Sequence, residues 1–298
     1  MIQKNFMKNN IHVFYDKRMS VPNSSTSTPS HMKPAQMAKL LRESKLLLSW
    51  PTFDPTSWEE LKSIHSKEYL SNIQNGINSI FENAQVIWST KLVDSLLWTS
   101  GSMIAATHHA SEFGIAVSLS SGFHHAHYEG AGTFCLVNGL VLAALKASSK
   151  FPSKPVAILD CDYHYGNGTD DILGRFIHNP EIQIKHFSLG KHFKKPIQAN
   201  DYINKIKEIC KRIEKNEFNI VLYQSGMDVL IGDPMGGGIL TPKQTYERDL
   251  MIFQAAQKSK TPIVWNLAGG YKTSKSDRTN PVLLGHMNTF RAAKAAGY

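Results

Sequence analysis

Cysteine is scarce in this chain. Three cysteines (Cys135, Cys161 and Cys210) occur in 298 residues, and no two have CxxC spacing. They form no even disulfide framework, which favours a reducing compartment. No apolar run reaches the roughly 20 residues of a membrane span. The first ten residues lack the apolar core of a Sec signal. These absences predict a cytoplasmic protein without a membrane span; export by a non-Sec route stays open.

Acidic residues are outnumbered, with 24 Asp and Glu against 33 Lys and Arg, a net charge of +9. A basic protein can bind nucleic acid. Here, however, many lysines fall on the polar face of an expected helix over residues 202–215, opposite an apolar stripe. Nucleic acid is therefore an unlikely partner. The run Lys191-His192-Phe193-Lys194-Lys195 is the one patch that could contact an acidic partner.

Hydrophobic residues form 42% of the chain, enough for a substantial core. Caps and apolar periodicity predict helices over residues 36–47, 57–74, 90–112, 138–148, 202–215 and 241–258. Short apolar runs predict strands over residues 11–15, 114–120, 156–162, 182–189, 219–224 and 262–267. This alternation indicates an open, doubly wound, mostly parallel α/β sheet with helices on both faces. We expect one domain over residues 1–298, with a long surface loop over residues 19–34.

Asp160, Asp162 and His164 alternate at the end of the apolar run Val156–Leu159. On a strand, alternate side chains point to one side, roughly 6–7 Å apart from one to the next. Two carboxylates and an imidazole on one side suit a divalent metal such as zinc. The alternative is a polar cluster on an edge strand, and this motif alone does not decide between them.

Polar residues also follow the other expected strands. They are His124 and His125 after residues 114–120, Ser188 at the end of 182–189, Asp228 after 219–224, and Tyr271 after 262–267. Ligands of open α/β sheets bind outside the carboxyl ends of the strands, so these residues could line one crevice.

The chemistry of a hydrolytic zinc site assigns a role to most of these polar residues. Asp162 and His164 supply two ligands, and Asp228, preceded by glycine, is the best third ligand. Zinc lowers the pKa of bound water to about 7. His124 and His125 offer a base and an acid, with Asp160 and Asn167 available to orient them. Tyr271 could donate a hydrogen bond to the developing oxyanion.

Four motifs together resemble the zinc-dependent histone deacetylase family, which also contains acetylpolyamine amidohydrolases. They are Gly122-Phe123-His124-His125-Ala126, the run Asp160-Cys161-Asp162-Tyr163-His164-Tyr165-Gly166-Asn167-Gly168-Thr169, Gly226-Met227-Asp228 with Gly232-Asp233-Pro234, and Gly269-Gly270-Tyr271. The resemblance covers about residues 11–290 and implies an arginase/deacetylase-like α/β fold. It implies hydrolysis of N-ε-acyl-lysine or a related amide.

The resemblance also implies site residues. Asp162, His164 and Asp228 match the zinc ligands, and Tyr271 matches the tyrosine that polarises the scissile carbonyl. His125 takes the principal acid/base position beside His124. The implied substrate-tunnel and rim residues are Gly132, Phe134, Phe193, Pro234 and Met235, with Cys135 beside Phe134. A structural monovalent cation, potassium, is implied at Asp160, Ser188 and the main-chain oxygens of Asp162, His164 and Leu189.

Several positions depart from the family pattern. Tyr165 replaces a second histidine, and Asn167 stands where some members have aspartate. The loop after Ser188 is short and lacks a proline-rich pattern, which weakens the assignment of Phe193 as a tunnel wall. The arginine that some members place at the inner end of the tunnel is not evident; Gln36 is nearby.

The predicted function is therefore a zinc-dependent deacylase acting on acyl-lysine in proteins or peptides. An acetylpolyamine amidohydrolase is the closest alternative. A polycationic substrate favours a carboxylate at the rim, where Met235 stands, so acyl-lysine is preferred. A catalytically silent acyl-lysine or metabolite binder is the alternative from another class, and the complete set of ligands, base and tyrosine argues against it.

Overall fold

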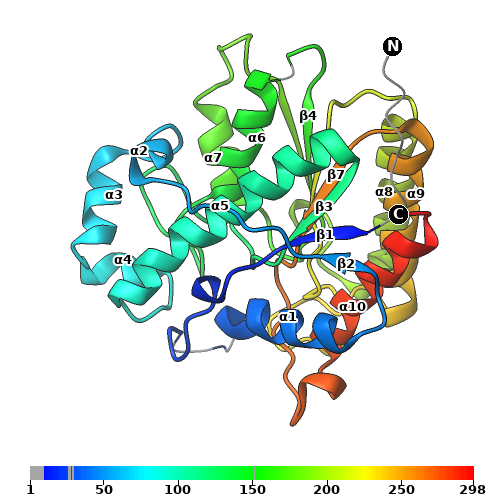
Figure 1. The fold of residues 1–298 in the computed structure, drawn as a ribbon, viewed down its shortest axis with the longest axis horizontal. Helices are drawn as coiled ribbons and strands as arrows, with labels where there is room; N and C mark the ends of the chain where they lie inside the picture. Colours follow the sequence, from blue (N-terminus) through cyan, green and yellow to red (C-terminus); the bar gives the residue numbers. More distant parts are fainter. Residues whose placement is uncertain (1–9, 26–27, 29, 151) are drawn as a thin grey trace.

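The computed structural model describes residues 10–25, 28, 30–150 and 152–298. In these residues seven strands form one parallel sheet in the order β2-β1-β3-β7-β6-β4-β5 (Figure 1). Their bounds are β1 Ile11–Phe14, β2 Leu48–Ser49, β3 Ile115–Ser118, β4 Val156–Asp160, β5 Ile184–Ser188, β6 Val221–Gln224 and β7 Ile263–Asn266. Six coincide with expected strands. The two-residue β2 is too short to leave an apolar pattern.

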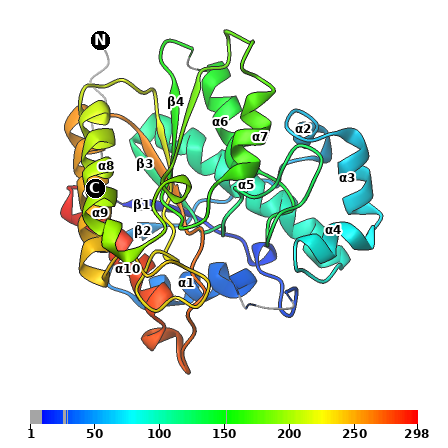
Figure 2. The same ribbon diagram turned by 180° about the vertical axis from the view of Figure 1, so that it is seen from behind.

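Helices cover both faces of this sheet (Figures 1 and 2). One face carries α1 Lys33–Glu43, α8 Ala199–Glu214, α9 Pro242–Ser259 and α10 Pro281–Ala295; the other carries α5 Thr90–Phe113 and α6 Gly139–Lys150, with α7 Asn167–Gly174 beside α6. Alternate strand residues enter opposite cores: Ala157 and Leu159 pack on the first face, and Ile158 on the second. The doubly wound α/β architecture is confirmed.

Three short helices form a lobe against α5 and α6: α2 Trp58–Leu61, α3 Lys67–Gln74 and α4 Asn78–Asn83 (Figure 1). The expectation of one helix over residues 57–74 was wrong. Ser57 caps α2 as expected, but Ser66 begins a second helix by accepting a hydrogen bond from the Tyr69 backbone N–H. The Ser66 N–H donates to the carbonyl of Tyr128, which fixes the break between the helices.

Single-turn 3-10 helices lie at Lys17–Met19, Ser30–Met32, Leu189–Lys191, Pro196–Gln198 and Asp277–Thr279. Residues 26, 27 and 29 of the expected loop over residues 19–34 lie outside the described residues. Much of the rest is not solvent-exposed loop: Met19, Val21 and Ser24 are buried, and α1 begins at Lys33. The segment therefore packs over the carboxyl ends of the strands.

The sheet edge formed by the ends of β3, β4, β6 and β7 positions the site. β4 ends at Asp160, two residues before the expected end, so Asp162 and His164 lie in the loop that precedes α7. The positions of Asp162 and His164 are thus set by this loop, and not by strand alternation.

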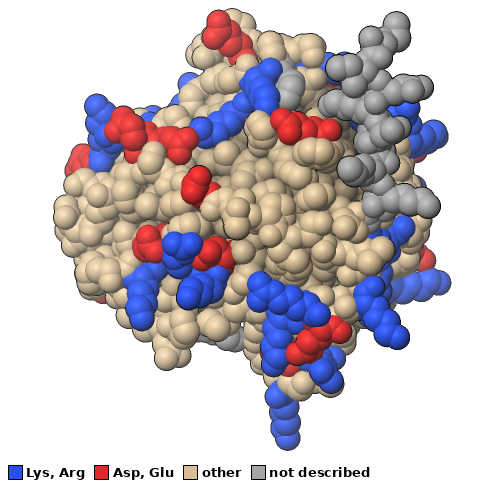
Figure 3. Space-filling model, in the orientation of Figure 1, with Lys and Arg blue, Asp and Glu red and all other residues tan. Residues whose placement is uncertain are grey.

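Charged side chains are mixed on the face shown in Figure 3, where lysines and arginines lie among aspartates and glutamates. Lys146 pairs with Glu60 at 2.6 Å, for example, and Arg278 with Glu43 at 3.0 Å. None of the helices in the described ranges is long and apolar enough to cross a membrane.

Candidate metal centre and active site

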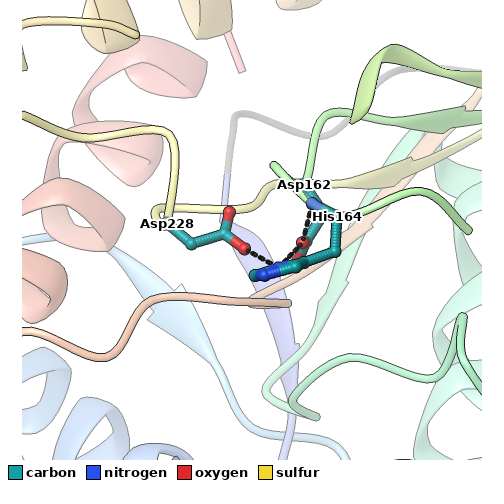
Figure 4. Close-up of side chains that lie close together, drawn as sticks. All are labelled: Asp162, His164 and Asp228. Atoms are coloured by element: carbon teal, nitrogen blue, oxygen red, sulfur yellow. Dashed lines mark hydrogen bonds and ion pairs between the residues drawn. The ribbon is translucent and has the colours of Figure 1, made fainter. Parts of the chain in front are cut away.

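Asp162, His164 and Asp228 form a compact cluster at the carboxyl ends of β4 and β6 (Figure 4). One potential ligand atom from each lies within 4.8 Å of the others. His164 Nδ1 stands between the carboxylates, 2.9 Å from Asp228 Oδ2 and 3.3 Å from Asp162 Oδ1. Asp162 and Asp228 are buried, and His164 is half-buried. One imidazole nitrogen and two carboxylate oxygens are a donor set that fits zinc.

Glycines allow these loops to approach one another. A Cβ atom on Gly269 would lie 2.5 Å from carboxylate oxygens of both Asp162 and Asp228, and a Cβ on Gly226 would lie 2.5 Å from Asp162 Cα. Backbone donors also hold the carboxylates: the Gly269 N–H donates to Asp162 Oδ2 at 2.8 Å, and the Tyr163 N–H to Asp228 Oδ1 at 2.8 Å. The carboxylates are therefore positioned by the fold itself.

The charges of the triad depend strongly on one another. Burial and the adjacent charge of Asp162 raise the pKa of Asp228 to about 8. Burial opposes protonation of His164. The hydrogen bonds of His164 with both carboxylates have the larger effect and raise the pKa of His164 to about 10. The cluster thus retains protons that a bound dication would displace. This behaviour supports the fit of the donor set to a divalent metal.

The two histidines after β3 have different orienting partners. His124 Nδ1 lies 2.7 Å from Asp160 Oδ2, and His125 Nδ1 lies 2.7 Å from Asn167 Oδ1. An amide oxygen only accepts, so the Asn167 contact places the proton of neutral His125 on Nδ1 and leaves Nε2 as the basic nitrogen.

These partners separate the protonation of the two rings. Burial opposes a charge on His124, yet the carboxylates of Asp160, Asp162 and Asp228 raise its pKa to about 9. Burial, together with the charge of His124, lowers the pKa of His125 to about 4. Near neutral pH His125 is the unprotonated ring and His124 the protonated one. A pair with separated pKa values can supply a base and an acid.

Tyr271 lies across the site from this pair, with its ring centroid 6.3 Å from that of His164 and 5.5 Å from that of Phe134. Asp233 fixes its backbone, because Asp233 Oδ2 accepts from the N–H groups of Tyr271 at 2.7 Å and Lys272 at 3.0 Å. The Tyr271 hydroxyl stays neutral, since burial and the charge of Asp162 raise its pKa well above the usual value. It can therefore donate a hydrogen bond.

The expected tunnel residues fall into two groups. Phe134 lines the same cavity as Tyr271 and both histidines, and Gly132 lies against His125, where a Cβ would meet its carbonyl oxygen at 2.4 Å. Phe193 instead packs on Tyr202, with ring centroids 5.5 Å apart, and is not among the described residues that line this cavity. Pro234 is exposed, and Met235 is half-buried with its N–H on Asp233 Oδ1.

Four supporting residues were not assigned a role from the sequence: Lys33, Gln224, Asp233 and Arg248. Gln224 Nε2 donates to Asp160 Oδ1 at 2.9 Å, and buried Arg248 donates to the carbonyl of Gly226 at 3.0 Å. Gln224 ends β6 and Asp233 is part of a quoted motif, so both had a signal in the sequence. Lys33 and Arg248 had none, because helix periodicity does not reveal a buried cation.

Comparison with known proteins identifies the family. The model of the histone deacetylase domain matches residues 28–287. The chain belongs to the histone deacetylase family. The resemblance predicted from its motifs is therefore confirmed.

Relatives are about a quarter identical to this chain over the residues that align. Histone deacetylase 2 of Arabidopsis thaliana is 27% identical over 239 residues, covering 73% of this chain and 62% of that protein. Histone deacetylase 8 of Xenopus laevis is 27% identical over 222 residues, covering 63% of this chain and 68% of that protein. The crystal structure of the HDA15 HD domain superposes with a TM-score of 0.74 at 18% identity, covering 96% of this chain and 92% of that one. This match shows the shared arginase/deacetylase fold.

Proposed function

We propose that this protein is a zinc-dependent amidohydrolase that removes acyl groups, such as acetyl, from the ε-amine of lysine. The observation that carries the proposal is the convergence of two separately oriented histidines and Tyr271 on one cavity, with Asp162 of the metal triad in its wall. Membership in the histone deacetylase family supports an amide substrate. Zinc held by Asp162, His164 and Asp228 would polarise the amide carbonyl and lower the pKa of a water molecule.

The chain's own groups then move the protons. His125 Nε2 takes a proton from the attacking water, while Asn167 Oδ1 accepts a hydrogen bond from the His125 Nδ1–H and keeps the ring oriented. His124, held by Asp160, has the proton that the departing lysine amine needs. The Tyr271 hydroxyl donates to the oxygen on which negative charge develops. Phe134, beside Tyr271, forms an apolar wall for the lysine side chain.

A monovalent cation, potassium, is proposed beside the metal centre. Asp160 and Ser188 are paired at the ends of β4 and β5, followed by Leu189, and both side chains offer oxygen atoms. His186 adds a positive charge here when its ring is protonated, since His186 Nε2 lies 3.7 Å from Asp160 Oδ2. Burial opposes a charge on His186, but Asp160 and Asp170 raise its pKa. We therefore expect activity to depend only weakly on potassium.

Acylpolyamines remain the competing substrates. Lys194 Nζ lies 3.0 Å from the carbonyl oxygen of Tyr163 and 4.6 Å from the centroid of the Tyr163 ring. Tyr163 stands between the metal ligands Asp162 and His164 in the sequence. This cation near the mouth of the site disfavours a polycationic substrate. The partner expected from these features is an acyl-lysine peptide or protein, with no role for nucleic acid, in the cytoplasm.

The test is turnover of acetyl-lysine peptides and acetylspermidine by zinc-loaded protein, with Tyr271→Phe as the matched control. We expect faster hydrolysis of the peptides and a strong loss in the variant. Faster turnover of the polyamine would reverse the ranking. A zinc-loaded protein that is inert on both would point instead to a silent binder.

A further inference from the structure

A cavity extends from the metal centre toward the start of α1 and the first half of α5; we call it the inner pocket. Its lining includes Asp162, both histidines and Tyr271 on one side, and Lys33 and Leu96 on the other. The pocket is thus continuous with the place where an acyl group is cleaved. Lys33 lies at the far side of the inner pocket, and neither the metal triad nor the histidine pair requires its positive charge.

Lys33 is buried there, and the carboxylates of Asp162, Asp228 and Asp233 attract its charge without forming a hydrogen bond to it. Its side chain is 3% exposed, and its ammonium donates to the carbonyl oxygen of Ala268 at 2.5 Å. Among the described residues this is its one hydrogen-bond acceptor, although an ammonium has three N–H donors. A buried ammonium with one hydrogen bond, to a neutral carbonyl, is costly unless an anion accepts from its other N–H groups.

The position of Lys33 in α1 adds to this cost. Lys33 is the first residue of the helix, Met32 provides no capping side chain, and the first turn has no acidic residue. The N-terminus of a helix is already its positive end, where a cation is unfavourable. Helix stability therefore does not account for a lysine at this position, and the end of α1 and the ammonium both favour an anion.

His31 is a second polar residue of the inner pocket whose hydrogen-bonding capacity is not fully used. Its Nδ1 atom is buried and has no hydrogen bond to any residue that the structure describes. Burial, together with the charge of Lys33, lowers the pKa of His31 to about 4, so the neutral ring can donate from one nitrogen. Lys33 and His31 both line the inner pocket, on the same short segment.

The hydrogen bonds around Lys33 place it close enough to the metal centre for a short acyl chain to reach both. Lys33 binds the carbonyl of Ala268, and the next residue, Gly269, donates to the metal ligand Asp162. Only one peptide unit therefore separates the two contacts. A second carboxylate on a four-carbon acyl group lies roughly 4 Å beyond the scissile carbonyl, from three C–C bonds of about 1.5 Å. Leu96 and Phe123 provide apolar contacts for the methylenes between them.

We propose that Lys33 and His31 form a carboxylate site, and that the protein removes acyl groups ending in a second carboxylate, such as succinyl, from lysine. This inference rests on the proposed amidohydrolase function. Water adds its hydroxyl to the amide carbonyl carbon, the C–N bond breaks, the amine leaves with a proton, and succinate is released with two carboxylates. A carboxylate could reach Lys33 from two sources: the second carboxylate of the acyl group, or the acid that is released from any acyl substrate. The experiment must separate these two sources.

The experiment compares succinyl-lysine with butyryl-lysine in one peptide, because the two acyl chains are equal in carbon number and differ in charge. Acetyl-lysine is the third substrate. The zinc-loaded wild type should prefer succinyl over butyryl in kcat/KM by at least about tenfold. Lys33→Met should abolish that preference, and Lys33→Arg, which keeps the charge, should retain part of it. Far-UV circular dichroism verifies that both variants fold.

Calorimetry gives a readout that does not depend on turnover. Succinate should bind the wild type more tightly than butyrate does, and Lys33→Met should remove the difference. Equal use of succinyl and butyryl peptides would overturn the inference. The inference would also be overturned if Lys33→Met lost turnover of acetyl-lysine and succinyl-lysine equally. Lys33 would then bind only the acid that is released from any substrate. If the protein hydrolyses no acyl-lysine, the proposed function is wrong. The carboxylate site is tested separately by calorimetry, and it is overturned if succinate binds no more tightly than butyrate.

Discussion

The two sides of the active site are opposite in charge and differ in how fully their polar groups are satisfied. On the acidic side, Asp162 and Asp228 accept hydrogen bonds from backbone N–H groups and from His164. On the basic side, Lys33 has one carbonyl acceptor and His31 Nδ1 has none among the described residues. The acidic side is built to hold a cation in a fixed position. The basic side is left to be completed by an anion from the substrate or product.

Removing a ligand from the acidic side should have the largest effect. Asp228→Asn leaves one carboxylate and one imidazole for the metal, so zinc content should fall well below one ion per chain. Activity should fall by more than about a thousandfold, the scale of losing charge stabilisation at a reacting centre. Metal analysis and kcat/KM on an acetyl-lysine peptide are the measurements. Asp201→Asn, on the exposed face of α8, is the matched control. Full zinc occupancy and activity in Asp228→Asn would refute the assignment.

Tyr271→Phe should leave the acidic side intact and remove a donor to the oxyanion. We expect kcat to fall by about 10²–10³ with unchanged zinc content. Tyr246→Phe in α9 removes a hydroxyl elsewhere and should keep wild-type kinetics. An unchanged kcat in Tyr271→Phe would mean that the tyrosine only packs against Phe134.

Adding a carboxylate beside His125 should change its pKa. Burial and the charge of His124 lower that pKa to about 4, and the neutral Asn167 does little to oppose them. Asn167→Asp should raise it by about one to three units, because an opposite charge favours the imidazolium. The base must be unprotonated, so the acidic limb of the kcat/KM profile should move to higher pH. An unmoved limb would exclude His125 as the base.

The basic side should affect the pH dependence of stability, the smallest of these effects. His31 has a folded-state pKa of about 4 and an unfolded value near 6.5. The unfolded chain therefore binds more protons between these values, so stability is complete above about pH 6.5 and falls as the pH drops toward 4. His31→Gln should reduce this slope in urea unfolding by up to about 1.4 kcal/mol per pH unit. Other buried histidines remain in both proteins, so the difference in slope isolates His31. Identical slopes would contradict the assignment.

The acidic side could be predicted from the sequence, because each of its residues follows a short apolar run. Asp228 was identified through Gly226, two residues before it, and Gly226 does lie against Asp162. The details differed: Asp162 and His164 lie beyond the end of β4, so the loop determines their convergence. Local capping signals also failed to show that residues 57–74 form two helices.

The basic side could not be predicted, because its burial depends on contacts between distant parts of the chain. Lys33 reaches the carbonyl of Ala268, 235 residues away, only when α1 packs beside the segment that follows β7. In the sequence Lys33 falls in the expected surface loop over residues 19–34, before the expected helix over residues 36–47. The tunnel position of Phe193 likewise depends on the path of the loop after β5, which the sequence pattern does not define.

Anomalous diffraction from a zinc-soaked crystal is the most direct test of the central claim. Zinc should appear at one strong site, bound by His164 Nδ1 and by carboxylate oxygens of Asp162 and Asp228, on the side of the cavity opposite Lys33. Zinc bound elsewhere, or with the Asp228 carboxylate turned away from it, would contradict the account.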